Sequence, residues 1–374
     1  MSINPFAENV FINRFKMQII HETILYVDLS ALEKNYRYLK KKLNSNTKII
    51  AVVKAFAYGH GDIIIAKKLS ELGVFGFWVA DFEEGVILRK SGIKESIIVA
   101  NPGSKSFDEV KKYYLEPVIY NFKLLDVYGN NSTPLSIHIK FNTGMNRNGF
   151  NINDINLLTR KLKDYSHLKV KSICSHLAVS NDTTKDDFTL KQFRRFNQVC
   201  TIFSEKLNIK PNRHILNTHG VLRFPQEQKE IVRLGIGLYG IGNDVNIKPI
   251  SKLVSNIAQI RIINKKECVG YDASFVAKEK MKIAVVPLGY ADGINRKLGD
   301  GNGQVLIKKT FAPIMGKISM DSFMIDISSI SAKEGDTVIV FGKENSITDI
   351  AKNLNTIPYE ILATLNRRIK RVYH

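Results

Sequence analysis

The sequence predicts an α/β protein in two parts, a (β/α)8 TIM-type barrel and a second, mostly antiparallel β domain at the C-terminus. Eight short apolar runs lie between residues 49 and 235, and amphipathic helical stretches separate most of them. This alternation is typical of a closed barrel. After about residue 254 the pattern changes to alternating β segments with Gly-rich turns. A length of 374 residues suits two such domains.

The eight apolar runs are the predicted barrel strands. They are IIAVV from 49, VFGFWVA from 74, IIVA from 97, PVIY from 117, LSIHIKF from 135, KVKSICSHL from 169, RHILN from 213 and IVRLG from 231. A doubly wound open sheet is the competing architecture, but no Gly-x-Gly-x-x-Gly turn follows the first run. In a barrel, catalytic groups lie at the C-terminal ends of the strands.

One helix before the first run and one near the C-terminus have readable boundaries. Ser30 is predicted to cap the first helix, and Glu33 completes a capping box. Its apolar stripe, expected to pack on the barrel exterior or a neighbouring helix, is Leu32, Tyr36, Leu39 and Leu43. A short helix is predicted inside the β domain, from Ser346 or Thr348 to Leu354.

The predicted domain boundaries are 24–254 for the barrel and 255–374 for the β domain. Residues 1–23 form an N-terminal extension whose expected packing partner is the β domain. The β segments of the second domain are NIAQIRIINKKECVGYDASF, MKIAVVPLGY, QVLIKK, FMIDIS and DTVIVFG. Because no flexible linker stands out, we expect the two domains to pack directly on each other.

Composition excludes several classes of protein. Apolar residues make up 44% and charged residues 24% of the chain, as in globular proteins rather than disordered ones. The formal charge of +20 also occurs in nucleic-acid binders, but the lysines are spread through amphipathic segments and form no recognisable nucleic-acid module. A solvated Lys-rich surface, or one that attracts anionic ligands, accounts for the charge.

The apolar runs and the cysteines indicate the expected compartment and metal content. The N-terminus has no secretory apolar stretch and no run is long enough to span a membrane, so a cytoplasmic protein is expected. Cys174, Cys200 and Cys268 are far apart and odd in number. They therefore predict free thiols, with neither a disulfide framework nor a metal site.

The first predicted strand runs directly into VVKAFAYGHG, residues 52–61. This places Lys54 where barrel enzymes carry catalytic groups. Its apolar neighbours Val52, Val53 and Phe56 would depress the pKa of the amine, as Schiff-base chemistry requires. From position alone, a surface lysine at a strand end is an equally good interpretation.

Eight motifs along the chain decide between these two interpretations of Lys54. They are VVKAFAYGHG (52–61), KFNTGMNRNGF (140–150), SHLAVSND (175–182), NTHGVLRFP (217–225), VRLGIGLYG (232–240), GYDASF (270–275), PLGYADGINR (287–296) and GKISMDSF (316–323). Together they resemble the alanine racemases over about residues 24–374. Any one motif alone would be a weak signal.

The resemblance implies a pyridoxal 5'-phosphate enzyme that interconverts L- and D-alanine and supplies D-alanine for peptidoglycan. Lys54 would hold the cofactor as a Schiff base. The residues implied at its phosphate are Tyr58, Asn217, Thr218, Gly235 and Ile236. Arg233 would face the pyridine nitrogen, where a permanently protonated guanidinium keeps the ring a weaker electron sink. His176 would lie beside the ring and link Arg233 to the catalytic tyrosine.

Racemisation requires a proton to leave one face of Cα and another to arrive on the opposite face, so the family uses two bases. By resemblance these are Lys54 for the D-alanine proton and Tyr271 for the L-alanine proton. The implied substrate contacts are Arg147, Met320 and Tyr290. Lys140 matches a lysine that is carbamylated in many members. The resemblance also implies a homodimer in which two subunits share each active site, with no nucleic acid, membrane or metal partner.

Five positions depart from the usual family pattern. Asn142 stands where Asp is usual, Ser319 where Cys is common, Phe56 where Asn is common, and Asp272 where a Gly is frequent. Arg367 is interpreted as replacing a phosphate-binding tyrosine. None of these changes removes a proton-transfer group.

Other functions stay open at this point. A racemase of broader specificity, for example toward serine, would share all eight motifs. Decarboxylases of the related barrel family carry a catalytic cysteine near the C-terminus, whereas the last cysteine here is Cys268. Single-domain cofactor-binding proteins resemble the barrel alone and would lack the segment with Tyr271 and Met320. Nucleic-acid binding rests on net charge only.

Overall fold

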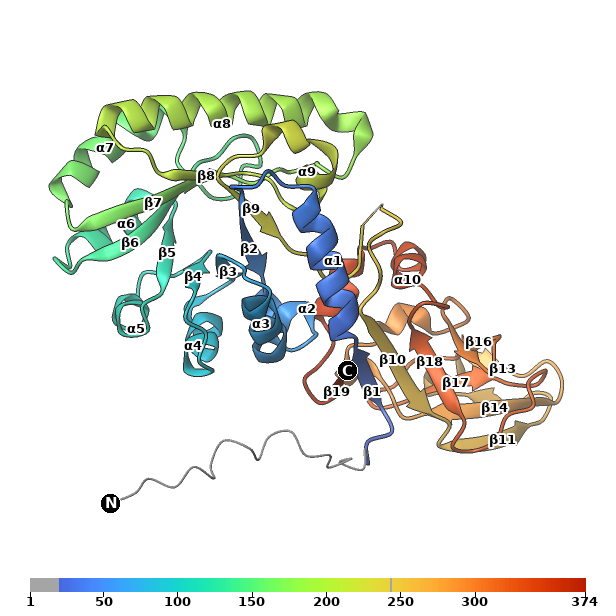
Figure 1. The fold of residues 1–374 in the computed structure, drawn as a ribbon. Coiled ribbons are helices and arrows are strands. Elements are labelled where there is room, and N and C mark those ends of the chain that lie inside the picture. The colour runs from blue at the N-terminus through green and yellow to red at the C-terminus, as the bar shows by residue number, and fades with distance from the viewer. Residues whose placement is uncertain (1–19, 243) are drawn as a thin grey trace, which may run out of the picture.

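The computed structural model describes residues 20–242 and 244–374, which form a barrel and a neighbouring β domain (Figure 1). The barrel strands are β2 (Lys48–Val52), β3 (Gly76–Val79), β4 (Ser96–Val99), β5 (Glu116–Ile119), β6 (Leu135–Lys140), β7 (Leu168–Cys174), β8 (Asn212–His214) and β9 (Ile231–Leu234). They are parallel in the order β8-β7-β6-β5-β4-β3-β2-β9. Each strand overlaps one of the eight predicted runs and begins no more than one residue before it, so the predicted barrel is confirmed.

The two ends of this sheet meet. The backbone N–H of Arg233 on β9 donates to the carbonyl of Leu216, just after β8 (3.0 Å). Helices follow most strands, as parallel strands require. They are α2 (Lys54–Tyr58), α3 (Asp62–Glu71), α4 (Phe82–Lys90), α5 (Phe107–Lys112), α6 (Phe122–Gly129), α7 (Ile155–Asp164), α8 (Asp186–Leu207) and α9 (Thr218–Arg223). The long helix α8 runs over β7 and β8 in the view of Figure 1.

The β domain is a nine-stranded sheet with a small hairpin. Its strands are β1 (Ile24–Val27), β10 (Ser251–Asn256), β11 (Gln259–Ile263), β14 (Met281–Val286), β15 (Gln304–Ile307), β16 (Thr310–Met315), β17 (Phe323–Asp326), β18 (Thr337–Phe341) and β19 (Lys370–Tyr373). The hairpin is β12 (Cys268–Val269) with β13 (Phe275–Val276). Every pair except β1 with β19 is antiparallel, which confirms the predicted character of this domain.

Two short helices belong to the same part of the chain, α10 (Ile347–Asn353) and α11 (Pro358–Ala363). The hydroxyl of Ser346 accepts from the backbone N–H of Thr348 and caps α10. This is the predicted helix, with Ser346 as its cap. None of the described helices is both long and apolar enough to cross a membrane.

The sheets divide the chain differently from the predicted boundaries of 24–254 and 255–374. β1 lies between β10 and β19, so both 24–27 and 251–254 pair in the β domain and not in the barrel. The run ILYV was missed because four apolar residues before a helix give too short a signal to assign to a sheet. Of the N-terminal extension, Thr23 bonds Ser255 of the β domain (2.8 Å), and residues 1–19 lie outside the described part.

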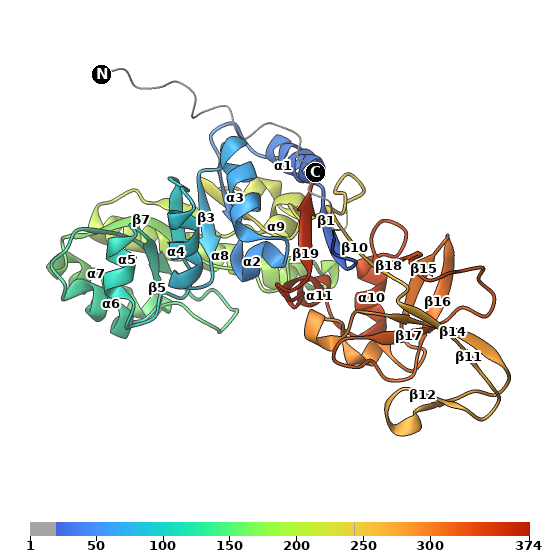
Figure 2. The same cartoon turned by 90° about the horizontal axis from the view of Figure 1, so that it is seen from below.

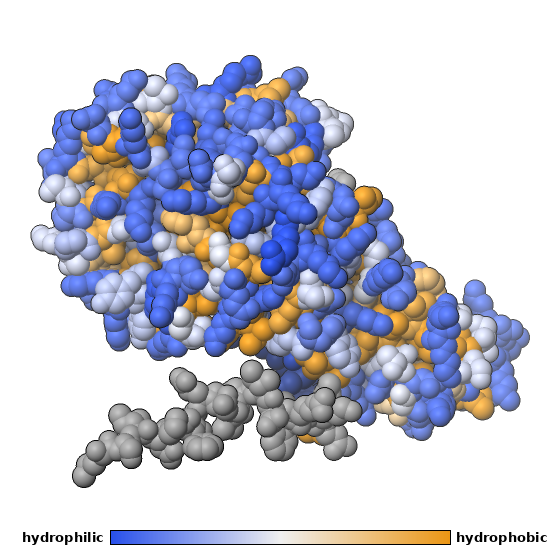
Figure 3. Space-filling model, viewed as in Figure 1, coloured by the Kyte–Doolittle hydropathy of each residue, from blue (hydrophilic) through white to orange (hydrophobic). Residues whose placement is uncertain are grey.

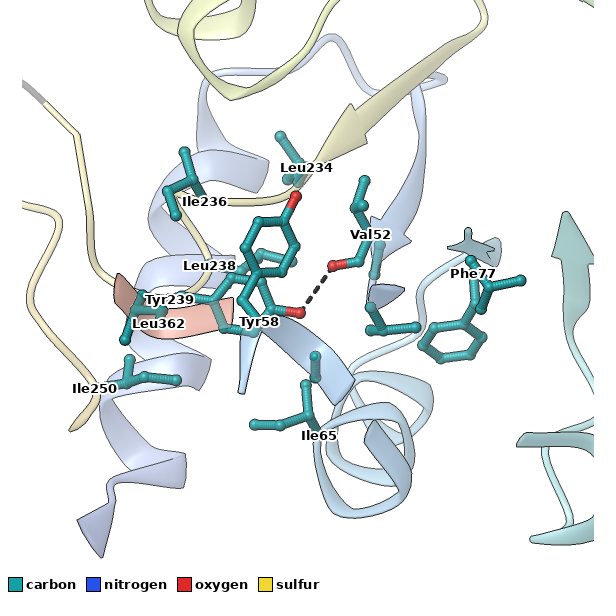
Figure 4. Packing of buried hydrophobic residues seen from close by; sticks show 14 of the residues in the cluster. Val52, Tyr58, Ile65, Phe77, Leu234, Ile236, Leu238, Tyr239, Ile250 and Leu362 are labelled. Carbon is teal, nitrogen blue, oxygen red and sulfur yellow. Dashed lines mark hydrogen bonds between the residues drawn. The ribbon is translucent and has the colours of Figure 1, made fainter. Parts of the chain in front are cut away.

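The barrel and the β domain share one cluster of buried apolar residues. Figure 4 shows Tyr58 and Tyr239 in contact, with ring centroids 4.7 Å apart, and the Tyr239 hydroxyl donating to the carbonyl of Val52 (2.8 Å). Cys174 and Cys200 are buried and Cys268 is exposed, all three as free thiols. The face seen in Figure 3 is mostly hydrophilic.

Helix α1 (Leu29–Lys41) corrects one prediction. Asp28, not Ser30, is its cap, because the Asp28 carboxylate accepts from the Ala31 backbone N–H (2.8 Å). The Ser30 hydroxyl instead donates to that carboxylate (2.7 Å). Glu33 forms no capping box and pairs with Arg37 and with Lys68 of α3. The predicted stripe is confirmed, since Leu32, Tyr36 and Leu39 are buried and Leu43 is half-buried.

This capping assignment predicts unequal effects of two neighbouring substitutions. Asp28→Ala should lower the free energy of unfolding by about 1 kcal/mol, because it removes the acceptor for the first turn of α1. Ser30→Ala is the matched control and should cost less than half as much. Urea denaturation followed by circular dichroism measures both. Equal losses, or a larger loss for Ser30→Ala, would contradict the assignment.

Candidate active site

A pocket opens at the C-terminal ends of the barrel strands, with about 860 Å³ of space including its mouth. Ten residues singled out from the sequence line it: Lys54, Tyr58, Lys140, Arg147, His176, Asn217, Thr218, Arg233, Gly235 and Ile236. Six lining residues were not predicted: Val52, Trp78, Ala100, Cys174, Ser175 and Tyr359. Strand-end positions therefore converge as the barrel geometry predicts.

Lys54 begins an unusual turn. Ala55, Phe56, Ala57 and Tyr58 have φ between 51° and 55°, which makes α2 a left-handed turn that non-glycine residues rarely adopt. Glu84 of α4 holds its start. One Glu84 oxygen accepts from the Ala55 backbone N–H (2.6 Å) and the other from the Ala80 N–H (2.7 Å). Lys54 is thus fixed between the ends of β2 and β3.

The β domain holds the other end of this turn. Arg371 on β19 donates to the Gly59 carbonyl (3.0 Å), and the Tyr373 hydroxyl donates to the His60 carbonyl (2.9 Å). A Cβ on Gly59 would lie 2.1 Å from the Leu362 carbonyl oxygen, so only glycine fits there. The position of Lys54 therefore depends on contacts from both domains.

The inner wall of the pocket suits an anion. A Cβ on Gly235 would lie 3.0 Å from the Tyr58 hydroxyl. The absence of a side chain at position 235 therefore keeps the space beside that hydroxyl open. The Thr218 hydroxyl accepts from the Gly235 N–H (3.2 Å), and Asn217 caps α9 by accepting from the Gly220 N–H (2.9 Å). Hydroxyls and backbone N–H groups of this kind can hold a phosphate.

Arg233 is a buried cation, only 4% exposed. Its Nη2 donates to the Ser175 carbonyl (2.6 Å) and lies 3.1 Å from His176 Nδ1. Its Nη1 bonds the His214 ring, and Trp78 covers it with the ring centroid 5.2 Å away. Desolvation and the Arg233 charge lower the pKa of His176 well below its usual value. His176 is therefore neutral and presents Nδ1 as an acceptor to Arg233.

The pocket mouth concentrates positive charge. Desolvation by the pocket walls, together with the Arg147 charge, lowers the pKa of Lys54. Burial, the largest cause, and the charges of Arg147 and Arg233 lower the pKa of Lys140. Both amines are therefore easier to deprotonate than an ordinary lysine, and the site favours anionic ligands.

The three residues predicted in the β domain do not line this pocket. Tyr271 lies in the turn η4 (Tyr271–Ala273) between β12 and β13 and is 66% exposed. Tyr290 and Met320 are exposed as well, and they adjoin each other because the Ala291 N–H donates to the Met320 carbonyl (3.0 Å). Figures 1 and 2 both show the β12–β13 hairpin at the end of the β domain away from the barrel. One chain therefore does not bring Tyr271 to Lys54.

One of the departures was interpreted wrongly. Arg367 is exposed and lies over the Phe56 ring, 4.6 Å from its centroid, so it does not stand in for a tyrosine in the pocket. Tyr359 of α11 lines the pocket instead, with its ring centroid 6.0 Å from that of Tyr58. A lone tyrosine on a short helix more than 300 residues after Tyr58 carries no spacing signal. Its place depends on how the domains pack.

Local structure accounts for two further departures, Asn142 and Asp272, and a third, Ser319, forms a local hydrogen bond. Asn142 accepts from the backbone N–H groups of Gly144 (3.1 Å) and Asn146 (3.0 Å) and so holds the loop that carries Arg147. Asp272 has a φ of 59°, which explains a frequent glycine at this position. The Ser319 hydroxyl donates to the Ser322 carbonyl (2.7 Å).

Two protein-family models match nearly the whole chain: "Alanine racemase, N-terminal domain" over residues 27–243 and "Alanine racemase, C-terminal domain" over 250–373. The chain belongs to the alanine racemase family. It is 34% identical to the alanine racemase of Treponema denticola, covering 93% of this chain and 97% of that protein. With the alanine racemase of Clostridium kluyveri it shares 34% identity, covering 93% of each.

Solved alanine racemases have the same fold. The enzyme from Bartonella henselae, with covalently bound pyridoxal phosphate, matches with a TM-score of 0.87 and 29% identity, covering 94% of this chain and 99% of that chain. The enzyme from Bacillus anthracis with bound L-Ala-P matches with a TM-score of 0.88 and 27% identity, covering 95% of each chain. This member of the alanine racemase family therefore keeps both domains of its relatives.

The Glu84 contacts predict that one carboxylate stabilises the turn of this alanine racemase family member. Glu84→Ala should lower the free energy of unfolding by about 2 kcal/mol, because two backbone N–H groups lose a charged acceptor. Glu83→Ala changes an exposed neighbour on the same helix and should be nearly neutral. Chemical denaturation measures both. Equal stability of the two variants would contradict the role given to Glu84.

Proposed function

We propose that this chain interconverts L- and D-alanine with pyridoxal phosphate in the barrel pocket. The convergence of nine other predicted residues on the pocket of Lys54 is the observation that carries the proposal. The phosphate would be held by Tyr58, Thr218 and the backbone at Gly235 and Ile236. Asn217, which caps α9, would hold the start of that helix beside the phosphate. Tyr359, which the sequence did not point to, would add a second hydroxyl at this wall.

Lys54 would carry the cofactor covalently and later act as a base. Its lowered pKa supports both roles, because the attacking form of a lysine is the neutral amine. Pyridoxal phosphate, when bound, withdraws electrons from the substrate Cα and acidifies its proton. Arg233 would face the pyridine nitrogen and, as a permanent donor, keep that nitrogen unprotonated. Neutral His176 would sit between Arg233 and the catalytic tyrosine.

Tyr271 would be the base on the opposite face of Cα, and it would come from a second copy of the chain. Its 66% exposure, on a hairpin remote from its own barrel, supports a site shared within a homodimer. Tyr290 and Met320 are exposed on the same domain and would arrive with it. Arg147 would bind the substrate carboxylate through its guanidinium.

Carbamylation of Lys140 would suit this arrangement. The reaction of carbon dioxide with an amine needs the neutral amine, and the pKa of Lys140 is lowered. The resulting anion would offset the charge of Arg147 and hold its guanidinium in place. Initial rates with alanine and serine, with and without bicarbonate, would report both this role and the substrate preference.

Covalent attachment gives the first functional test. The purified protein should be yellow, and Lys54→Ala should lose that absorbance, because Lys54 is the lysine in the cofactor motif. Lys140→Ala is the matched control in the same pocket and should still carry cofactor on Lys54 after borohydride reduction and peptide mapping. Cofactor mapped to Lys140, or to any lysine other than Lys54, would refute the assignment of Lys54 as the cofactor-binding lysine.

Mixing two inactive variants tests the shared site. Lys54→Ala and Tyr271→Phe chains should each be inactive, since each lacks one base. A mixed dimer would hold one complete site and one empty of both bases, so random exchange at equal concentrations should restore about a quarter of wild-type activity. Native mass spectrometry verifies the mixed dimers. Background activity in their presence would refute the shared site while leaving racemisation itself untouched.

A further inference from the structure

A line of polar side chains crosses the barrel interior and ends at Arg233. Five successive strands, β5 to β9, each contribute one residue: Glu116, His138, Ser172, His214 and Arg233. Glu116 Oε2 lies 2.9 Å from His138 Nε2, His138 Nδ1 lies 2.6 Å from Ser172 Oγ, and that Oγ lies 2.8 Å from His214 Nε2. His214 Nδ1 then bonds Arg233 Nη1. We call these five residues the cross-barrel chain.

All five residues are at least nine-tenths buried. Their N–H and O–H donors must therefore find acceptors inside the protein and not in solvent. Arg233 has only donors, which makes His214 Nδ1 an acceptor and puts the His214 proton on Nε2. That proton goes to Ser172, and the Ser172 hydroxyl then donates to His138 Nδ1. His138 therefore carries its proton on Nε2 and donates it to the Glu116 carboxylate. Every hydrogen points from Arg233 toward Glu116.

A cationic His138 would break this order. Its Nδ1–H would donate to Ser172, which already accepts from His214, and the Ser172 proton would have no acceptor among its bonded partners. An unpaired buried donor is costly. Burial and the Arg233 charge also lower the pKa of His214 well below its usual value. Both rings of the cross-barrel chain are therefore neutral Nε2–H tautomers.

The two ends carry opposite charges. Arg233 forms no ion pair within the described residues, whereas Glu116 is held ionised. Burial acts to raise the pKa of Glu116, but the hydrogen bond from His138 and the contact of Lys171 Nζ with Oε1 (2.7 Å) lower it below its usual value. The buried guanidinium thus reaches a carboxylate through three neutral groups, which polarise one another in a low-dielectric interior.

We propose that the cross-barrel chain positions Arg233, with Glu116, His138 and Ser172 as positioning residues that act through His214. An acceptor at His214 Nδ1 fixes one edge of the guanidinium and so orients the edge that faces the pocket. The link to catalysis rests on the proposed function, because it assumes that Arg233 faces the cofactor ring. The hydrogen-bond order itself does not depend on that function.

The order can be read without any activity. Protein labelled with [15N]histidine should give imidazole spectra in which His138 and His214 are both neutral with the proton on Nε2, across pH 6–8. The two rings are assigned from single substitutions to Gln. Either ring found with its proton on Nδ1, or His138 found cationic, would overturn the proposal.

Ser172→Ala tests the transmission. It removes the one link between the two rings, so the Nε2–H proton of His214 should lose its acceptor and move upfield. The kcat for alanine should fall roughly fivefold, the effect of about one net hydrogen bond, with KM changed less than twofold. Ser106→Ala is the matched control, since Ser106 is another buried serine, bonded to Pro102 and Tyr128 just before α5. Glu116→Gln keeps an acceptor oxygen and should retain the His138 tautomer.

Two outcomes would count against the proposal. One is a His214 signal in Ser172→Ala that is unchanged from wild type, and the other is a kcat equal to that of Ser106→Ala. Should Ser172→Ala fail to fold, the wild-type spectrum alone still decides the hydrogen-bond order. A protein with the predicted tautomers but no racemase activity would refute the proposed function and leave the cross-barrel chain intact.

Discussion

The left-handed turn after Lys54 is the constraint on which the site depends. Four consecutive non-glycine residues with positive φ are unfavourable by themselves, so the turn persists only where surrounding contacts hold it. Glu84 supplies those contacts from the barrel, and Arg371 and Tyr373 supply them from the β domain. Because the turn is held from both sides, the amine of Lys54 has a defined position at the mouth of the pocket.

Charge is the second organising factor. Lys54, Lys140 and Arg147 meet at the pocket, and Arg233 lies buried beneath it. Such a cluster is unstable without anions, which is consistent with a site built for a phosphate and a carboxylate. The pKa values of both lysines fall in this environment. Burial, together with repulsion between these cations, thus favours the neutral amines that the proposed chemistry requires.

Sequence reasoning failed once at a local helix cap and otherwise where a longer-range contact decided the outcome. Ser30 is a good capping residue, but it lies inside the first turn of α1, and Asp28 just before the helix takes the Ala31 N–H. The run at 24–27 belongs to the β domain because it pairs with β10 on one edge and with β19 on the other, both more than 200 residues away in the sequence. Tyr359 reached the pocket through domain packing, while Arg367 stayed outside. None of these contacts leaves a periodic trace in the sequence.

The sequence by itself determined the eight barrel strands and the antiparallel β domain, because strand periodicity is a local property of the chain. Ten of the pocket residues came from the resemblance of its motifs to those of the alanine racemases. Tertiary structure alone decided the tautomers of His138 and His214, which follow from the burial of Arg233 and from the order of five neighbouring strands. It also left Tyr271 far from the lysine of its own chain, because the β12–β13 hairpin points away from the barrel.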